Sequence, residues 1–237
     1  MVAKNKLLVV AAHPDDEVLG CGATVAKRVS QGWEAYLLIL TKGVAGRYSS
    51  QPDAATLKAV ETETTQLGAE IDKATAAIGF KKVFRASFPD NRMDTVSRMD
   101  VSQEILTVLK EVRPTTIFTH HPGDYNWDHT IAFDSVMMAA RSSPGEFAPQ
   151  EILSFEVPSS TERSWQSEER TFRPNVYVNI KGSIDKKKLA LSYYASEKRP
   201  YPHPRSIEAL EYLSRKRGSE VGLEYAEAFH LIRRTEE

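Results

Sequence analysis

The chain has 237 residues, 41% of them hydrophobic and 27% charged, which is enough to bury the core of one large α/β domain over residues 1–237. Its 31 basic and 32 acidic side chains leave a net charge of −1, which gives no global field to attract nucleic acid or an anionic membrane. No apolar stretch reaches the roughly 20 residues of a membrane helix, and the N-terminus has no signal-peptide pattern. The single cysteine excludes an internal disulfide, and it fits the reducing cytoplasm.

Apolar and polar segments alternate along the first part of the chain. In chain order they predict a strand over 6–12, a helix over 17–32, a strand over 33–40, a helix that ends near 78, a strand over 83–86, a helix around 101–109, and a strand over 115–119 that leads into another helix. Strands that alternate with helices favour an α/β fold with a Rossmann-like, mostly parallel sheet flanked by helices.

The pattern loosens beyond Pro144, and we expect this C-terminal part to add strands and helices around the pocket. Residues 152–157 and 175–180 have the composition of strands, and a polar loop is predicted between them over 158–174. Helices are predicted over about 183–197 and 205–217.

A few features of the predicted helices and loops are interpreted as packing or as solvated surface. Gly20 and Gly22 indicate that the first helix packs closely on the sheet, and Cys21 is expected to be a small buried residue of that helix. Lys186–Lys188 is interpreted as a solvated helix face. The proline-rich segment 199–205 either walls a substrate pocket or only connects two helices.

The first predicted strand ends in one imidazole and three carboxylates, His13-Pro14-Asp15-Asp16-Glu17. The carboxyl end of a strand is where open α/β sheets place their chemistry. His13 and Asp16 are three residues apart where the strand turns into a helix, so both side chains can reach one metal ion. Asp15 remains as a base for a metal-activated water. The alternative is that the acids only cap the helix and complement its dipole, which leaves the histidine unexplained.

A second strand, over 115–119, also ends in a loop rich in histidine and aspartate. We expect His129, at the start of the next helix, to be the third metal ligand, and Asp128 and Asn126 to orient ligands or contact substrate. One of His120 and His121 is expected to cover the strand end while the other faces solvent. Four of the six histidines lie in the loops after these two strands, which a scatter of surface histidines does not explain.

Two further loops carry candidates for substrate binding. Arg47 follows the second strand and is a candidate to bind a hydroxyl, phosphate or carboxylate group, although arginine is also common on exposed loops. Asp90 follows the third strand, at the same edge of the sheet as the expected metal ligands, and is interpreted as an acceptor for sugar hydroxyls. A turn-forming role for Asp90 beside Pro89 is the alternative.

The segment Ala12–Glu17, together with Asp124-x-Asn126-x-Asp128-His129, resembles the PIG-L/LmbE-like family of zinc-dependent N-deacetylases. The resemblance implies a hydrolase that removes an N-acetyl group from an amino sugar or glycoconjugate and releases acetate and a free amine. It implies that His13, Asp16 and His129 bind zinc and that Asp15 is the general base; Fe2+ or Mn2+ would suit the same ligands. It also implies that homo-oligomers are common. Tyr225–Phe229 resembles a C-terminal signature of the family.

The chain departs from two patterns of that family. Val44 stands where many members have a glutamate after the second strand, and Asn126 stands where some members have a histidine three residues before the last ligand. The identity of the proton donor and of the oxyanion partner therefore stays open, and His121 is a candidate from the same loop.

Two other function classes remain open. A Rossmann-type nucleotide-binding protein would need a glycine-rich turn after the first strand, where this chain has His-Pro-Asp-Asp-Glu. Three acids at that helix start would also repel a phosphate. A non-catalytic metal- and sugar-binding relative would keep the same ligands, and only the release of acetate separates it from an enzyme.

Overall fold

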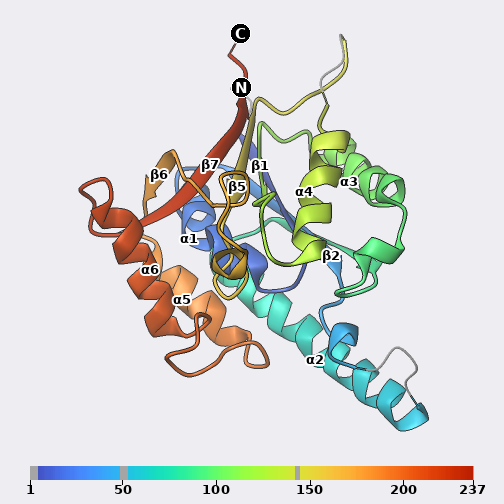
Figure 1. The fold of residues 1–237 in the computed structure, drawn as a ribbon. Coiled ribbons are helices and arrows are strands. Elements are labelled where there is room, and N and C mark those ends of the chain that lie inside the picture. The colour runs from blue at the N-terminus through green and yellow to red at the C-terminus, as the bar shows by residue number, and fades with distance from the viewer. Residues whose placement is uncertain (1–4, 49–52, 142–144, 237) are drawn as a thin grey trace.

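The computed structural model describes residues 5–48, 53–141 and 145–236 (Figure 1). The strands are β1 (Lys6–Ala11), β2 (Glu34–Thr41), β3 (Lys82–Phe88), β4 (Thr116–His120), β5 (Glu151–Phe155), β6 (Val176–Asn179) and β7 (Ala226–Arg234). The helices are α1 (Asp16–Ser30), α2 (Ala54–Ile78), α3 (Arg98–Val112), α4 (Trp127–Ala139), α5 (Ile184–Tyr193) and α6 (Ile207–Ser219). Short 3-10 helices lie at η1 (Ala45–Arg47), η2 (Met93–Thr95) and η3 (Thr161–Arg163).

All seven strands form one sheet in the order β3-β2-β1-β4-β5-β7-β6. The first five strands in this order pair in parallel, and β7 runs antiparallel to both β5 and β6. Helices α1 and α5 lie on one side of the sheet, and α3 and α4 lie on the other (Figure 1). The predicted Rossmann-like, mostly parallel sheet flanked by helices is confirmed.

The central strand β1 is buried on both faces. Leu7 and Val9 belong to the core on the side of α1, α2 and α5, whereas Leu8 and Val10 belong to the core on the side of α3 and α4. Successive side chains of a strand point to opposite faces, so a strand covered by helices on both sides is apolar at every position. This explains the uninterrupted hydrophobic run that precedes His13.

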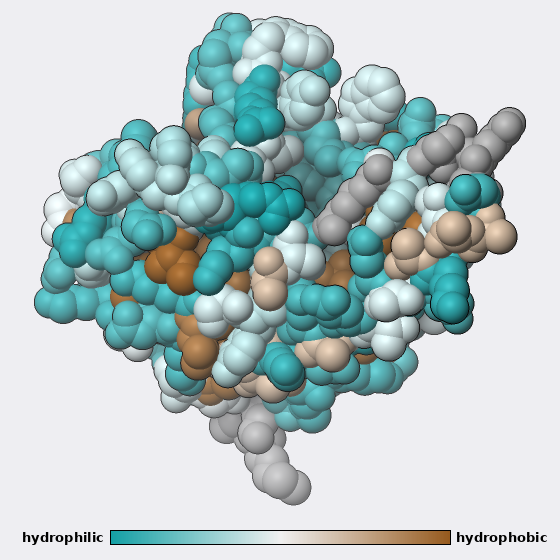
Figure 2. Space-filling model, turned by 90° about the horizontal axis from the view of Figure 1, so that it is seen from below, coloured by the Kyte–Doolittle hydropathy of each residue, from teal (hydrophilic) through white to brown (hydrophobic). Residues whose placement is uncertain are grey.

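The sheet order brings the two polar loops together. β1 and β4 are parallel neighbours, with Val9 opposite Phe118, so their carboxyl ends open side by side. β1 starts near the N-terminus at the top of Figure 1 and runs downward, and Figure 2 views the molecule from below. Most residues on this face are hydrophilic, and the hydrophobic ones form small, separate patches.

The close packing predicted for the first helix is confirmed at Gly20. A Cβ atom at this position would lie 2.2 Å from Cδ2 of the buried Phe155 ring, so only glycine fits. A Cβ at Gly22 would meet its nearest neighbour, Ile78, at 3.4 Å, which is an ordinary contact. Cys21 is buried, as predicted.

In the C-terminal part, one strand was not predicted and one prediction is wrong. No strand was predicted after residue 217, yet β7 lies between β5 and β6. Lys186–Lys188 is not uniformly solvated, because Lys187 is 3% exposed and its Nζ lies 2.6 Å from Glu227 Oε1. Helix α5 packs on α1 and α2, which brings this lysine inside. The strands of both parts share one sheet, in keeping with the single domain that stays a prediction for residues 1–237.

None of the helices in the described residues combines the length and apolar character that a membrane crossing requires.

Candidate metal centre

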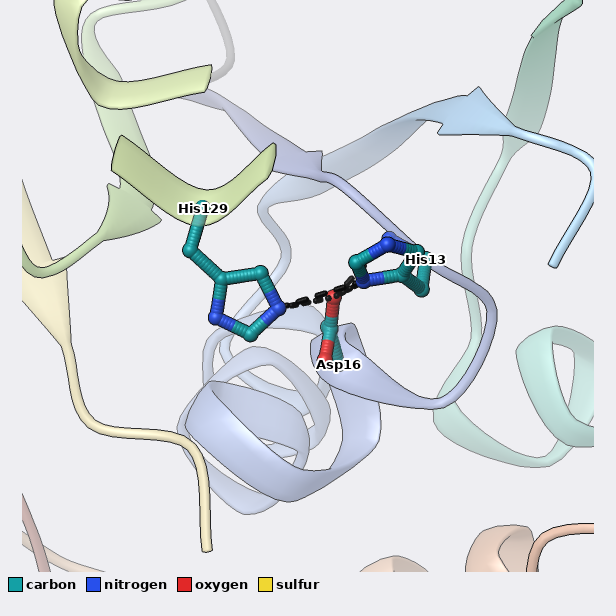
Figure 3. Close-up of side chains that lie close together, drawn as sticks. All are labelled: His13, Asp16 and His129. Carbon is teal, nitrogen blue, oxygen red and sulfur yellow. Dashed lines mark hydrogen bonds and ion pairs between the residues drawn. The ribbon is translucent and has the colours of Figure 1, made fainter. Parts of the chain in front are cut away.

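Three side chains from distant parts of the chain meet at the ends of β1 and β4 (Figure 3). His13 lies in the loop after β1, Asp16 is the first residue of α1, and His129 lies in the first turn of α4. His13 Nδ1 lies 3.2 Å from His129 Nε2, and Asp16 Oδ2 lies 3.3 Å from each of these nitrogen atoms. The three atoms therefore form a nearly equilateral triangle, made by the three residues predicted as metal ligands.

The triangle has the size that a tetrahedral ion requires. Nitrogen and oxygen ligands about 2.0–2.1 Å from such an ion lie about 3.3 Å from one another. Two imidazoles and one carboxylate leave the fourth position of a tetrahedral ion for water or substrate. Asp16 Oδ1 is buried and has no hydrogen-bond partner among the described residues. These residues therefore fit a divalent cation.

A second group of possible ligands, His13, Asp90 and Asp128, lies beside the first. It fits a cation less well, because its carboxylate oxygens already accept hydrogen bonds from the protein. Asp128 accepts from two backbone N–H groups, and Asp90 accepts from the backbone N–H of Gly46 and the hydroxyl of Thr41. Of the two groups, the triangle therefore fits a cation better.

The imidazole of His13 is oriented by Asp128. His13 Nε2 lies 3.0 Å from Asp128 Oδ2, which leaves Nδ1 facing the triangle. The backbone N–H groups of Asn91 and Met93 donate to the two oxygens of Asp128, at 2.7 and 3.0 Å. A carboxylate held in this way fixes the tautomer and the ring orientation of a ligating histidine. The sequence predicted that Asp128 would orient a ligand or contact substrate, and its role at a metal site stays a prediction.

The imidazole of His129 is oriented by Asp124. His129 Nδ1 lies 3.1 Å from Asp124 Oδ1, so its Nε2 faces the triangle. The hydroxyls of Ser160 and Thr161 donate to Asp124 from the loop after β5. Asp124 belongs to the sequence motif that contains His129, but no role was predicted for it. Its spacing from His129, five residues along one loop, was the available signal.

Both imidazoles favour the protonated form in the metal-free protein. Burial opposes protonation of His13, but the carboxylates around it outweigh burial and raise the pKa of His13 to about 10. Burial likewise opposes protonation of His129, and Asp16 and Asp124 together raise its pKa to about 9. A metal ion binds neutral imidazole and must displace these protons.

Asp15, the predicted base, is buried beside the triangle at the N-cap of α1. Its Oδ2 accepts a hydrogen bond from Arg205 Nη1 at 3.0 Å, whereas Oδ1 has no hydrogen-bond partner among the described residues. Burial raises the pKa of Asp15 to about 7, against the opposing charge of Arg205. A carboxyl group that titrates near neutral pH can both accept and return a proton.

Glu17, the third acid of the first motif, supports the loop instead of the triangle. Glu17 Oε2 accepts from the backbone N–H of Asp15 at 3.2 Å, and Oε1 accepts from the hydroxyl of Tyr194 at 2.6 Å. Burial raises the pKa of Glu17 to about 7, despite the hydrogen bond from Tyr194. Its carboxyl group therefore links the turn after β1 to the end of α5.

His120 and His121 are both buried, so the prediction that one of them faces solvent is wrong. His120 covers the strand end as predicted, because its Nε2 accepts from the backbone N–H of Ala12 at 2.8 Å and its ring stacks on His129. His121 Nε2 donates to the carbonyl of Arg170, and its ring packs edge-on against Phe172. The segment after β5 thus covers His121, and its role as proton donor or oxyanion partner of a substrate stays a prediction.

Asp90 lies beside His13, and Asn126 contacts the loop after β3 that also carries Asp90. Asp90 Oδ1 lies 3.4 Å from His13 Nε2, and Asn126 Nδ2 donates to Asn91 Oδ1 at 3.1 Å. Asn126 also caps α4, since its side chain accepts from the backbone N–H of Asp128. Arg47 is the last residue of η1, and its side chain lies outside the described part of the structure. Contacts of these residues with substrate stay predictions.

Arg205 is a site residue that the sequence analysis missed. It follows Asp15 by 190 residues and lies in the segment that was interpreted as a pocket wall or a connector. The segment is a connector between α5 and α6, and its last residue also reaches the predicted base. No local spacing or period in the sequence signals a pair so far apart.

The part of the chain that matches a known protein family contains all three residues of the triangle. Residues 8–140 match the PIG-L family model, described as GlcNAc-PI de-N-acetylase. An uncharacterized deacetylase of Escherichia coli is 26% identical over 192 residues, which cover 79% of this chain and 88% of the relative. The diacetylchitobiose deacetylase of Thermococcus kodakarensis is 25% identical, over 81% of this chain and 70% of the relative.

Solved structures share the fold. The crystal structure of a 4-carboxy-2-hydroxymuconate hydratase from Pseudomonas putida superposes with a TM-score of 0.76 and 21% identity, covering 98% of this chain and 99% of the hydratase. Because this neighbour is named a hydratase, the fold alone does not decide the reaction. The reaction must therefore be inferred from the residues of the triangle and from the residues around them.

Proposed function

The chain belongs to the PIG-L family, and from that membership we propose that it is a metal-dependent N-deacetylase. Its substrate is an N-acetylated amino sugar or a conjugate of one, and its products are acetate and a free amine. The observation that carries the proposal is the triangle of His13 Nδ1, Asp16 Oδ2 and His129 Nε2, with the buried carboxyl group of Asp15 next to it.

His13, Asp16 and His129 would hold the cation, and zinc is the ion that we propose. A bound cation acts as a Lewis acid that polarises the acetyl carbonyl and lowers the pKa of water. Fe2+ and Mn2+ suit the same ligands, so the proposal of zinc depends on metal analysis. The carboxylates behind the two imidazoles keep the ligating nitrogen atoms aimed at one point.

Asp15 is the proposed general base. Its Oδ1 has no partner among the described residues and can accept the proton of the attacking water. The same carboxyl group then returns the proton to the leaving amine, which its pKa of about 7 favours. His121 is the other candidate donor, but its Nε2 is engaged by the carbonyl of Arg170. We therefore place both proton transfers on Asp15.

The substrate class is supported by the relatives and by the character of the surface around the site. The family description and the Thermococcus relative both name N-acetylglucosamine-type substrates. Hydrophilic residues dominate the face in Figure 2, which suits a polar ligand. Asp90, Asn126 and Arg47 are the side chains that we propose to bind sugar hydroxyls or a charged aglycone.

Zinc-loaded protein incubated with a panel of N-acetylated sugars and conjugates tests the proposal, with primary amine and acetate as readouts. We expect equal amounts of the two products from at least one substrate. The Asp15→Asn variant should keep its metal and lose about 10²–10⁴-fold in turnover, because general base catalysis contributes about that factor. His13→Ala should lose both metal and turnover.

Two outcomes would contradict the assignment. Tight zinc binding by His13→Ala would mean that the triangle is not the metal site. Metal and sugar binding without any acetate release would favour the non-catalytic relative. The nucleotide-binding alternative is not favoured, because the turn after β1 carries carboxylates where a phosphate would bind. The cytoplasmic location and the homo-oligomeric state rest on the sequence arguments and stay predictions.

A further inference from the structure

The backbone and side chain of Asp15 have an unusual conformation for the first residue of a helix. Asp15 is the N-cap of α1, with a φ of 89° in the left-handed region that non-glycine residues rarely adopt. An aspartate at this position normally accepts a hydrogen bond from the first turn of its helix, but Asp15 makes no such bond. Residues held in such conformations concentrate at functional sites. Another part of the protein must therefore determine where this carboxylate points.

The group that takes the place of the helix N–H is the guanidinium of Arg205. Arg205 Nη1 donates to Asp15 Oδ2 at 3.0 Å and to Glu197 Oε2 at 3.3 Å. Arg205 Nε donates to Ser159 Oγ at 2.8 Å. The residue directly precedes Ser206, which caps α6 by accepting from the backbone N–H of Ala209. The guanidinium is thus held through both Nε and Nη1, and the backbone of Arg205 is anchored at the start of α6.

The loop after β5 contacts both Arg205 and the carboxylate that orients His129. Ser159 contacts the guanidinium, and the hydroxyls of the next two residues, Ser160 and Thr161, donate to Asp124 behind His129. Ser159 has a φ of 74°, a second left-handed residue in this network. The pair is not a chance surface contact, because the side chain of Asp15 is 1% exposed and that of Arg205 is 25% exposed.

We propose that Arg205 is a positioning residue for the general base. It binds Oδ2 of Asp15, turns the carboxylate away from the α1 N–H groups, and leaves Oδ1 as the oxygen that accepts the proton of water. Asp15 Oδ1 is buried and has no other partner among the described residues, as this role requires. The proposal rests on the proposed deacetylase function, since it assigns Arg205 to the base of that reaction.

Kinetics of three arginine variants test the role. We expect Arg205→Gln to lower kcat about 100-fold, the loss that follows when a reacting group is misplaced by about 1 Å. KM and zinc content should stay close to those of the wild type, and Arg205→Lys should recover part of the loss by supplying one donor. Arg199→Gln is the matched control, because Arg199 is exposed on the same loop and bonds only to nearby carbonyls among the described residues.

An unchanged kcat in Arg205→Gln would overturn the proposal. A loss of zinc that accounts for the whole fall in kcat would overturn it as well, since Arg205 would then support the metal site. The double variant Asp15→Asn with Arg205→Gln separates positioning from direct contact with substrate. If Arg205 acts through Asp15, the double variant is no slower than Asp15→Asn alone. A further 100-fold loss in the double variant would place Arg205 on the substrate.

A crystal structure tests the role of Arg205 independently of whether the protein is a deacetylase. In a crystal structure of zinc-loaded Arg205→Gln, we expect the Asp15 carboxylate to turn toward the free N–H groups at the start of α1. An unmoved carboxylate would contradict the positioning role, whether or not the wild type turns over any sugar. If the wild type turns over none while the carboxylate moves, the proposed function fails and the structural role of Arg205 stands.

Discussion

Each imidazole of the metal centre is supported by a carboxylate from a different direction. Asp128, behind His13, is fixed by backbone N–H groups of the loop after β3. Asp124, behind His129, is fixed by two hydroxyls of the loop after β5. The two nitrogen atoms are therefore aimed through the loops after β3 and β5, neither of which carries a proposed ligand. Loss of one supporting carboxylate should loosen one ligand and leave the other in place.

The Asp124→Asn variant tests this support. An amide can accept from His129 Nδ1 but carries no charge, so we expect the variant to bind zinc about 10–100-fold more weakly. Competition with a chelator of known affinity measures the change. Asp94→Asn is the control, because Asp94 is exposed on η2 and should leave zinc affinity unchanged. Equal affinities in the two variants would show that Asp124 does not support the metal centre.

The raised pKa values of His13 and His129 predict that zinc binding releases protons. The values of about 10 and about 9 lie above the ordinary 6.5, so at pH 8 both imidazoles of the metal-free protein are mostly in the cationic form, with a proton on each of their two nitrogen atoms. Zinc should displace about two protons near pH 8, and its affinity should fall by up to about 100-fold for each unit by which the pH drops. Calorimetry in buffers of different ionisation enthalpy counts the protons. Release of none at this pH would contradict the raised pKa values.

At the scale of elements, the contact between α1 and β5 reaches the metal centre. Gly20 lets α1 approach the ring of Phe155, and this ring packs against His120, which stacks on His129. A side chain at position 20 would push on this stack of rings. The packing of a helix on a strand is thereby coupled to the position of the proposed metal ligand His129.

Gly20→Ala should destabilise the protein. The added Cβ would lie 2.2 Å from the Phe155 ring, and overpacking a well-packed core costs about 1–3 kcal/mol. Gly22→Ala on the same helix is the control, because its Cβ has room and alanine is favoured over glycine in a helix by about 1 kcal/mol. Urea unfolding of both variants measures the difference. A Gly20→Ala protein as stable as Gly22→Ala would mean that the Phe155 ring can move aside for the added Cβ at little cost in stability.

The sequence predicted those parts of the molecule whose signals are local. The strands β1 and β4 and the polar loops that follow them could be predicted, because a buried strand and the ligands at its end are contiguous in the chain. Strand β7 was missed, since its buried half, Ala226–Phe229, contains a glutamate and its second half is only partly buried. The pairing of Asp15 with Arg205 was missed because it depends on tertiary structure alone.

At the scale of the whole molecule, the C-terminal segment is built into the N-terminal part of the fold. Glu227 on β7 accepts from the backbone N–H groups of Ala23 and Thr24 in α1. Lys187 on α5 donates to Glu227 and to the carbonyl of Leu19 in α1. One buried ion pair therefore joins α1, α5 and β7. The same helix α1 begins with the proposed metal ligand Asp16, and its N-cap is the proposed base Asp15.

Removal of one partner of this pair should weaken the whole fold. Lys187→Met leaves the buried charge of Glu227 without its cation, and breaking a buried pair costs about 3–5 kcal/mol in the free energy of unfolding. We expect the lower end of that range, because Glu227 keeps its two backbone donors. Chemical denaturation of the metal-free protein measures the loss. Lys186→Met is the control, since this neighbouring lysine is exposed and should change stability by about 0.5 kcal/mol or less.

The double variant Lys187→Met with Glu227→Gln separates the unpaired charge from the lost packing. If the cost comes from the buried charge, the neutral glutamine should recover part of the stability, because its one carbonyl oxygen can still accept from one of the two α1 backbone N–H groups. No recovery would instead assign the loss to the packing of the lysine side chain against α1. A Lys187→Met protein as stable as Lys186→Met would show that the C-terminal segment is held by its strand pairing alone, with no contribution from this ion pair.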